Sequence, residues 1–362
     1  MDISSVAQSD LTNAVTDYSV ADAMTDGATG DKETFYINQK WSKQLGYYKS
    51  VPDLKATIDA KARWVIGKGL KAAEEDLLLI RSIIGFGKDT FNTILENQIR
   101  TYHIAGDSFA EIIRDGIGIP VNLKPLDPGV IKIVCNGKGL ITRYEQVSKN
   151  DNNKVLRKFK PKNILHFSRN RTADEIHGIS IIDAVEDIIL MRNEAMKDMR
   201  TLMHRHVKPI VKWQIDTDDV NEIAAFKAKA DAAVENGENL YIPMGAADAE
   251  YLSLASNATL NPLPWISTLN SYFFQMTGVP QIIVGGSAEI TEASAKIAYL
   301  AWEQTVEEEQ LYIEEEIGMQ MGLDIELEFP ATLQNEMLSD QSKSERMQAA
   351  TPEDTAVTGA IQ

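Results

Sequence analysis

The sequence contains a single cysteine, Cys135, among 362 residues. One thiol cannot form a disulfide within the chain, and it also excludes a zinc site built on two or more thiolates. Long apolar runs are missing too, and no stretch of about 18 apolar residues predicts a transmembrane helix. The first residues have neither the basic region nor the apolar region of a signal peptide. We therefore expect a soluble protein of a reducing compartment.

Positive charge is scarce as well. Lysine and arginine number 36 against 53 aspartates and glutamates, which gives a formal net charge of −17. Most of such a surface would repel duplex DNA, which excludes a protein that grips nucleic acid on all sides. The length and the 44% of hydrophobic residues are sufficient for two or three folded units.

Motifs for catalysis are also lacking. The stretch Gly85–Thr90 has Ser82 where a phosphate loop needs its first glycine, and its lysine precedes an aspartate instead of a hydroxyl residue. His204 and His206 are two residues apart, so on a helix they point in different directions and do not easily share a metal. We predict no catalytic residue, no metal site, no cofactor and therefore no enzyme.

The two ends of the chain are polar. Residues 1–34 hold seven acids, one base and one aromatic residue, and the tail from about Ser339 is similar. Such segments have little apolar surface to offset the entropy of ordering. We predict a flexible arm over 1–34 and a reduced or disordered region over 331–362.

The first half between these ends predicts an α+β unit. Helices are expected from a cap at Asp53 to Gly67, over 74–84 and over 89–104. The period then changes to that of short strands, separated by glycine and proline. The expected strands cover 107–114, 121–123, 130–134, 140–144 and 164–167, and we interpret them as one antiparallel sheet packed on the helices.

The second half predicts long helices around a small insert. Helical spacing covers 180–206 and 262–278, and an acidic helix is expected over 289–321, followed by a strand over 324–329. The insert is βαβ-like, with a strand at 210–215, a helix at 218–235 and strands at 240–242 and 251–254.

Charge is distributed unevenly along the chain. Residues 131–171 contain eleven bases and two acids, whereas 301–328 contain ten acids and no base. Lysines that protect a strand edge and a solvated helix face would explain both segments. The alternative is that the basic segment meets phosphate or an acidic neighbouring subunit. We place this basic patch on Arg143, Lys154, Arg157, Lys158 and Lys160.

Several stretches, in this order, resemble the portal proteins of tailed bacteriophages, the HK97-type family. They are Asp53-Leu-Lys-Ala-Thr-Ile-Asp-Ala-Lys-Ala-Arg-Trp, Gly106-Asp-Ser-Phe-Ala-Glu-Ile-Ile-Arg-Asp, Pro120-Val-Asn-Leu-Lys-Pro-Leu-Asp-Pro, Ile164-Leu-His-Phe with His177-Gly-Ile-Ser-Ile-Ile-Asp-Ala, and Gly278-Val-Pro-Gln-Ile-Ile-Val-Gly-Gly. Each stretch alone is common, but their ordered combination is specific to this family.

The resemblance implies a portal fold with an α/β wing, a two-helix stem, a small βαβ clip and a long helix after a tunnel loop. After the arm, its regions would be the wing over 35–179, stem helices over 180–207 and 259–280, and the clip over 208–258. Then follow the tunnel loop and long helix over 281–322, a strand returning to the wing over 323–330, and a reduced crown.

The resemblance also implies partners and contact residues. A dodecameric ring at one capsid vertex would carry double-stranded DNA during packaging and ejection, and would contact the large terminase, the head–tail adaptor and the major capsid or scaffold protein. Such a ring is assembled in the host cytoplasm and belongs to the virion, without a membrane. The DNA-facing loop would include Gly285, Gly286, Ser287, Glu289 and Thr291. Docking on the clip would involve Trp213, Asp216, Asp218, Glu222 and Tyr241.

Two alternatives stay open from the sequence. One is another ring-forming head or tail component, which the order of long helix, insert and helix disfavours. The other is a nucleic-acid-processing enzyme that uses the basic segment, which would need clustered acids for metal ions that we do not find.

Overall fold

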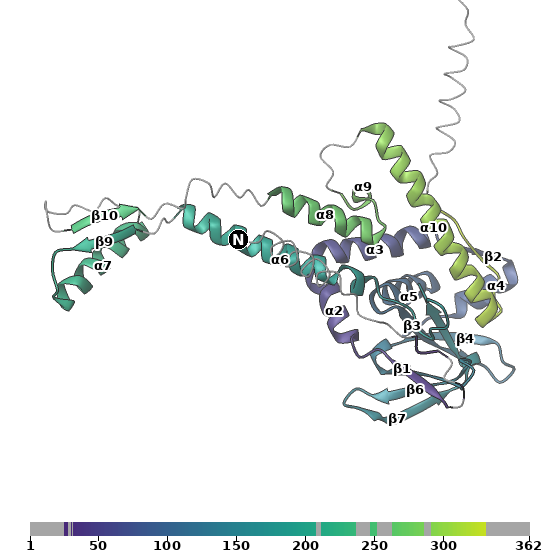
Figure 1. Ribbon diagram of the computed structural model, residues 1–362. Coiled ribbons are helices and arrows are strands. Elements are labelled where there is room, and N and C mark those ends of the chain that lie inside the picture. The colour runs from purple at the N-terminus through teal and green to yellow at the C-terminus, as the bar shows by residue number, and fades with distance from the viewer. Residues whose placement is uncertain are drawn as a thin grey trace, which may run out of the picture. The chain divides into compact units, whose positions relative to one another are not determined.

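A computed structural model describes residues 25–27, 30, 32–207, 211–236, 247–251, 263–285 and 291–330 (Figure 1). These residues divide into two compact units. Unit 1 combines the chain up to Asp183 with the chain from Val279 onward, and unit 2 is Ala184–Gly278. We describe each unit by itself. The domain boundaries expected from the resemblance stay predictions.

The main core of unit 1 lies between helices and a three-stranded antiparallel sheet. Helix α3 (Pro52–Ile66) packs on α5 (Phe91–Ala105), and its residues Leu54, Ile58 and Val65 are fully buried because they recur at helical spacing. The sheet has the order β4 (Pro120–Leu126), β3 (Asp107–Arg114), β8 (Ile164–Ser168). The shorter helices α2 (Trp41–Ser50) and α4 (Glu74–Ser82) flank the core.

A second sheet in unit 1 corrects the expectation of one continuous sheet. Its order is β1 (Thr34–Ile37), β5 (Ile131–Cys135), β6 (Ile141–Ser148), β7 (Asp151–Phe159), all antiparallel. It has its own apolar cluster, in which Ile133 and Tyr144 are buried. The short helix η1 (Pro128–Val130) separates the sheets, and the Asp127 side chain caps it by accepting a hydrogen bond from the backbone N–H of Gly129.

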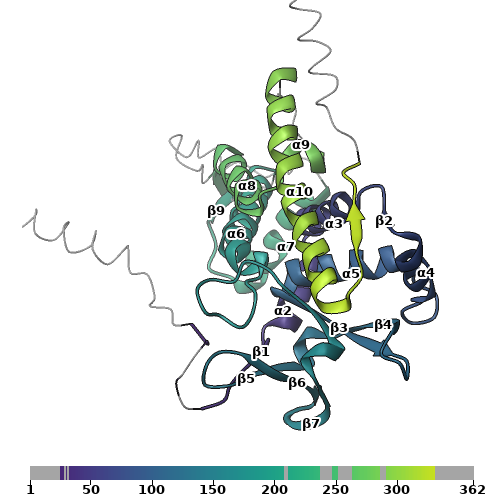
Figure 2. The same ribbon diagram turned by 90° about the vertical axis from the view of Figure 1, so that its right-hand side faces the viewer.

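The C-terminal part of unit 1 closes the main core. Helix α10 (Glu292–Met321) buries Trp302, Val306 and Ile313, and β11 (Ile325–Leu327) pairs antiparallel with β2 (Leu70–Ala72). Figure 2 shows α10 and β11 side by side at the yellow end of the colour scale. Segments about 250 residues apart in the chain therefore share one core.

Unit 2 consists of helix α6 (Ile181–Val207, which begins in unit 1), β9 (Val211–Ile215), α7 (Val220–Asn236), β10 (Ala247–Tyr251) and α8 (Leu263–Thr277). The expected order of strand, helix and strand is present. The two strands pair antiparallel, with Trp213 opposite Ala249.

Several boundaries differ from the sequence-based expectation. The flexible arm predicted over 1–34 is too long. Asp26 accepts a hydrogen bond from the backbone N–H of Ile176, Glu33 forms an ion pair with Arg143, and β1 begins at Thr34. Residues 1–24 and 331–362 lie outside the described residues. Asp53 is not the cap of α3, since Val51 occupies that position and Pro52 begins the helix.

Two later boundaries also shift. The long acidic helix begins at Glu292 and not at residue 289, because the Thr291 side chain caps it. Strand β10 of the insert covers Ala247–Tyr251, which begins before the strand expected at 251–254, and residues 252–254 lie outside the described residues. The strand expected at 240–242 also lies outside them.

Candidate functional site

Helices α6 and α8 of unit 2 present apolar side chains to solvent. Arg192 of α6 donates a hydrogen bond to Asn270 of α8 at 3.1 Å, and its guanidinium lies over the ring of Phe273. Leu269 and Phe273 of α8 are buried. Large exposed side chains remain on both helices: Leu190, Met191, Met196 and Met203 on α6, and Leu263, Trp265, Tyr272 and Met276 on α8.

Part of this apolar surface forms a groove of about 420 Å³. Its lining combines one side chain of α8, Trp265, with six of α6, namely Met191, Glu194, Ala195, Asp198, Met199 and Leu202. Helix α8 contains no charged residue at all over Leu263–Thr277. An uncharged helix with exposed aromatic and aliphatic side chains is typical of a surface that another protein covers.

The predicted clip is a small module in which the singled-out residues have different roles. Trp213 of β9 packs edge-to-face on Phe226 of α7, with ring centroids 5.2 Å apart, so it holds the module together. Asp216 and Asp218 are exposed, and Glu222 accepts a hydrogen bond from Thr217 at 2.9 Å. Tyr241 lies outside the described residues. The acids are the exposed members of this set, and the docking role of Trp213, Asp216, Asp218 and Glu222 stays a prediction.

The predicted tunnel loop lies between two helix ends. Helix α9 (Gln281–Val284) ends at Gly285, whose backbone φ of 93° and ψ of 136° suit glycine. Thr291 caps α10 by accepting a hydrogen bond from the backbone N–H of Ser294. Gly286, Ser287 and Glu289 lie outside the described residues. The prediction that this loop faces DNA is untested by the geometry, which describes only its two anchors.

A buried ionisable cluster fastens the helix that follows this loop. Glu309 of α10 contacts His103 Nε2 at 2.7 Å and also accepts a hydrogen bond from the hydroxyl of Tyr102, both on α5. Burial alone would raise the pKa of Glu309, but His103, Lys61 and Tyr102 together lower that pKa to about 2. Burial lowers the pKa of His103, so a neutral imidazole donates its Nε2–H to the carboxylate.

Two side chains of α10 also pair with the backbone of β8, an edge strand of its sheet. The backbone N–H of His166 donates to Gln320 Oε1 at 2.8 Å, and Gln320 Nε2 donates to His166 O at 2.9 Å. The Tyr312 hydroxyl accepts a hydrogen bond from the backbone N–H of Ser168 at 2.9 Å and donates one to Ser168 O at 3.0 Å. The helix therefore satisfies backbone groups that an edge strand leaves open.

This cluster is hidden in the sequence, because ten acids in one segment are typical of a solvated face. Two of the ten, Glu303 and Glu309, are instead buried. Both carboxylate oxygens of Glu303 lack a hydrogen-bond partner among the described residues, and burial raises the pKa of this group. The only available signal was the helical spacing, which places Glu309 on the same face as the buried Val306 and Ile313.

The predicted basic patch is partly neutralised within the chain. Arg143 pairs with Glu33 and Glu145, and Arg157 makes two hydrogen bonds to Glu111. Lys158 lies 3.6 Å from Glu145. Lys154 and Lys160 are exposed and form no ion pair among the described residues. Arg143 therefore links β6 to the residue before β1, and Arg157 links β7 to β3. Lys154 and Lys160 are the residues of the basic patch that remain available to a partner.

The described residues show no group of His, Cys, Asp and Glu side chains that could hold a metal ion. Within the same residues, no helix is both long and apolar enough to cross a membrane.

Comparison with known proteins gives a family match and structural matches. The model of a family described as phage portal protein matches residues 87–348. No curated protein matches the sequence. The fold is similar to a chain from the neck of a native GTA particle computed with C12 symmetry, with a TM-score of 0.66 and 14% identity over 87% of this chain and 91% of that one.

Two further structures have similar folds. A chain from the virion of a native gene transfer agent particle has a TM-score of 0.62 and 15% identity over 86% of this chain and 90% of that one. An HK97 family phage portal protein from Corynebacterium diphtheriae has a TM-score of 0.50 and 11% identity over 79% and 94%. At these identities the likeness concerns the fold.

Proposed function

The chain belongs to the phage portal protein family, and on this premise we propose that its copies assemble head to tail into a dodecameric ring at one vertex of a phage-like head. Double-stranded DNA passes through the ring during packaging and ejection. The family points to a structural rather than a catalytic role, and the motor that moves the DNA is a separate protein.

The observation that carries this proposal is the uncovered apolar surface of α6 and α8. Four large apolar side chains are exposed on each helix, and α8 has no charge that would favour hydration of its surface. Burying such side chains stabilises an assembly by about 1.5–3 kcal/mol each when burial is complete. In a closed ring every copy has a neighbour that can bury this apolar surface, so no copy leaves it exposed to solvent.

The charges support a conduit rather than a DNA-gripping protein. A net charge of −17 keeps contacts with a polyanion weak, which a sliding polymer requires. The loop between Gly285 and Thr291 is the proposed DNA-facing segment. The exposed acids Asp216, Asp218 and Glu222 are the proposed docking residues for the terminase and the adaptor. The capsid or scaffold protein is the proposed partner of Lys154 and Lys160.

Light scattering on the purified chain tests the assembly. Twelve copies of the 40.2 kDa chain have a mass of about 480 kDa. We expect Trp265→Glu to shift the mass toward the monomer, because it places a charge in the uncovered surface. The matched control is Leu140→Glu, an apolar position in the turn between β5 and β6 that is 64% exposed against 53% for Trp265, and it should leave the mass unchanged. A monomeric wild-type chain would contradict the proposal.

A further inference from the structure

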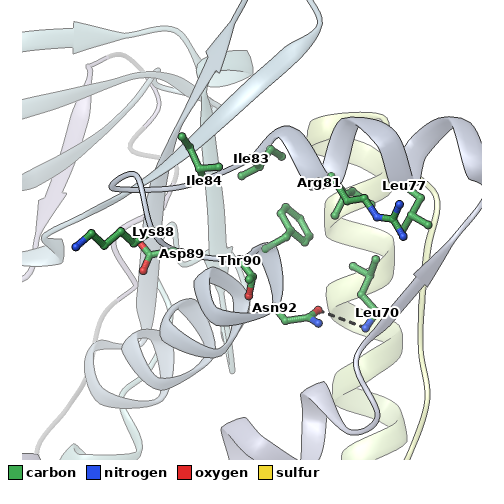
Figure 3. Close-up of a pocket in the computed structure, with 11 residues that line it drawn as sticks. Leu70, Leu77, Arg81, Ile83, Ile84, Lys88, Asp89, Thr90 and Asn92 are labelled. Carbon is green, nitrogen blue, oxygen red and sulfur yellow. Dashed lines mark hydrogen bonds between the residues drawn. The ribbon is translucent and has the colours of Figure 1, made fainter.

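Unit 1 contains a second groove, of about 440 Å³, between α4, the turn that follows it and the first turn of α5. Buried side chains of Ile80, Ile83 and Phe91 line it. Figure 3 shows Arg81 and Lys88 on two sides of the groove, with Thr90 and Asn92 between them. The groove therefore has an apolar floor, Arg81 at one side and Lys88 at the other, and the Lys88 side chain extends away from Thr90 and Asn92 in the view of Figure 3.

Large apolar side chains are exposed at this groove. Ile84 lines it with 50% of its surface exposed, and the neighbouring Leu78 and Phe86 are 65% and 67% exposed. The turn that carries Ile84 and Phe86 is held through its backbone, because Asn122 Oδ1 accepts from Gly85 N at 2.8 Å and Asn122 Nδ2 donates to Gly85 O at 3.0 Å. Its apolar side chains are not needed for the fold, which is typical of a binding surface.

The charge of the groove favours an acidic ligand. Neither Arg81 nor Lys88 forms an ion pair among the described residues. The single acid of the lining, Asp89, is occupied in part by a hydrogen bond from the backbone N–H of Phe86 at 3.2 Å. A ligand with carboxylates and apolar side chains would fit both features.

We propose that residues 1–24 of one copy bind this groove on the neighbouring copy, an inference that rests on the proposed ring. This segment contains four aspartates and no base, together with Ile3, Val6, Leu11, Val15 and Tyr18. The other terminal segment outside the described residues, 331–362, has mixed charge because it contains Lys343 and Arg346. The N-terminal segment, which has acids and apolar side chains but no base, therefore matches the charge and the apolar floor of the groove better than 331–362 does.

The place where the segment enters unit 1 favours a neighbouring copy over the same copy. The chain enters through Asp26, which contacts His177 Nδ1 at 2.8 Å, and through β1. Figures 1 and 2 both place β1 and α4 on different sides of unit 1. A head-to-tail ring brings two different surfaces of successive copies together, and the proposed exchange requires the sides that carry β1 and α4 to be these surfaces. A segment of 24 residues spans up to about 80 Å, which is sufficient for such an exchange.

Cysteine cross-linking between two full-length variants tests this contact. The native Cys135 is fully buried, so introduced thiols report their own positions. Ser9→Cys places a thiol in the segment, and Ser82→Cys places one at the exposed end of α4. When the two variants are mixed and assembled, we expect a two-chain product with a yield about tenfold above that of the control pair Ser9→Cys with Leu140→Cys.

Charge reversal provides the second readout. Arg81→Glu with Lys88→Glu in the Ser82→Cys chain should lower the yield about tenfold, whereas Arg81→Lys with Lys88→Arg should preserve it. Rings that form without this cross-link overturn the inference and leave the proposed function intact. A cross-link found only within single chains of the double variant Ser9→Cys with Ser82→Cys overturns the exchange between copies. Absence of rings contradicts the proposed function itself.

Discussion

Gly106 and Gly178 cross with their backbones in contact, so that a Cβ atom on either would lie 2.1 Å from the carbonyl oxygen of the other. Asp107, next to Gly106, accepts a hydrogen bond from Gly178 N at 2.9 Å. This crossing fixes the chain just before α6 begins. Two stretches of the sequence that resemble the portal family therefore meet at one point in space.

Replacing Gly178 by alanine should destabilise unit 1. The added methyl group has no room against the backbone of Gly106, and such overpacking costs about 1–3 kcal/mol. Urea unfolding followed by circular dichroism measures the loss. Gly116→Ala is the control, because open space surrounds that glycine and its φ is not positive, and the expected change is within about 0.5 kcal/mol. Equal stability of both variants would contradict the observed crossing.

The Glu309 cluster predicts loss of stability in acid. The pKa of Glu309 is about 2 in the folded chain and 4.5 in the unfolded chain. The unfolded state therefore takes up the proton first as the pH falls below 4.5. The contribution is complete above pH 4.5 and is lost toward pH 2. Because the pKa of His103 is lowered from 6.5, the unfolded state also protonates first below pH 6.5. Both groups therefore lower the free energy of unfolding as the pH falls.

Glu309→Gln tests this directly. At pH 7 it should lower the free energy of unfolding by about 3 kcal/mol, since one partner of a buried charged network is removed. The dependence on pH between 4.5 and 2 should flatten. Glu308→Gln, its exposed neighbour on α10, should change stability by no more than about 0.5 kcal/mol. An unchanged pH profile in the Glu309 variant would argue against the cluster.

Much of the fold was predictable from apolar spacing, whereas the polar cluster was not. Leu54, Ile58 and Val65 revealed α3, because a helix must bury its apolar face. Strand β7 was missed because Asp151 and its polar neighbours lack alternation, although pairing with β6 supplies the order. Glu309 looks like its exposed neighbours in the sequence. Its burial depends on His103 and Lys61, which come from distant helices, and no local pattern encodes that contact.

Glu303 should show the opposite behaviour. Its carboxylate is buried without a hydrogen-bond partner among the described residues, and its pKa is raised by burial first and by Glu307 second. A carboxyl group with a raised pKa costs stability as the pH rises above its unfolded value of 4.5, and the cost is complete above the raised pKa. Glu303→Met should therefore stabilise unit 1 by about 1–3 kcal/mol at pH 8, and by less at pH 4. Calorimetry at the two pH values measures this, with Glu315→Met as the control because Glu315 is exposed on the same helix and does not act on Glu303. A destabilised Glu303 variant would refute the prediction.

Proline at Gly285 and Gly286 should impair DNA filling without preventing ring assembly. A φ of 93° at Gly285 is inaccessible to proline, which also removes the N–H that donates to Gln281 O at 3.1 Å. The loop anchor would then change while α10 remains held by Glu309 and Gln320. DNA content per particle is the measurement, with Gly116→Ala, a glycine substitution in an open turn outside the loop, as the control. Normal DNA filling of particles that contain the proline variant would contradict the proposal that this loop faces the DNA.

Electron cryomicroscopy of the purified full-length chain tests the central claim most directly. The account predicts closed rings of twelve copies, in which α6 and α8 of adjacent copies cover each other around an open bore wide enough for duplex DNA. Particles without a bore, or monomers whose apolar helix surfaces stay exposed at every protein concentration, would contradict it.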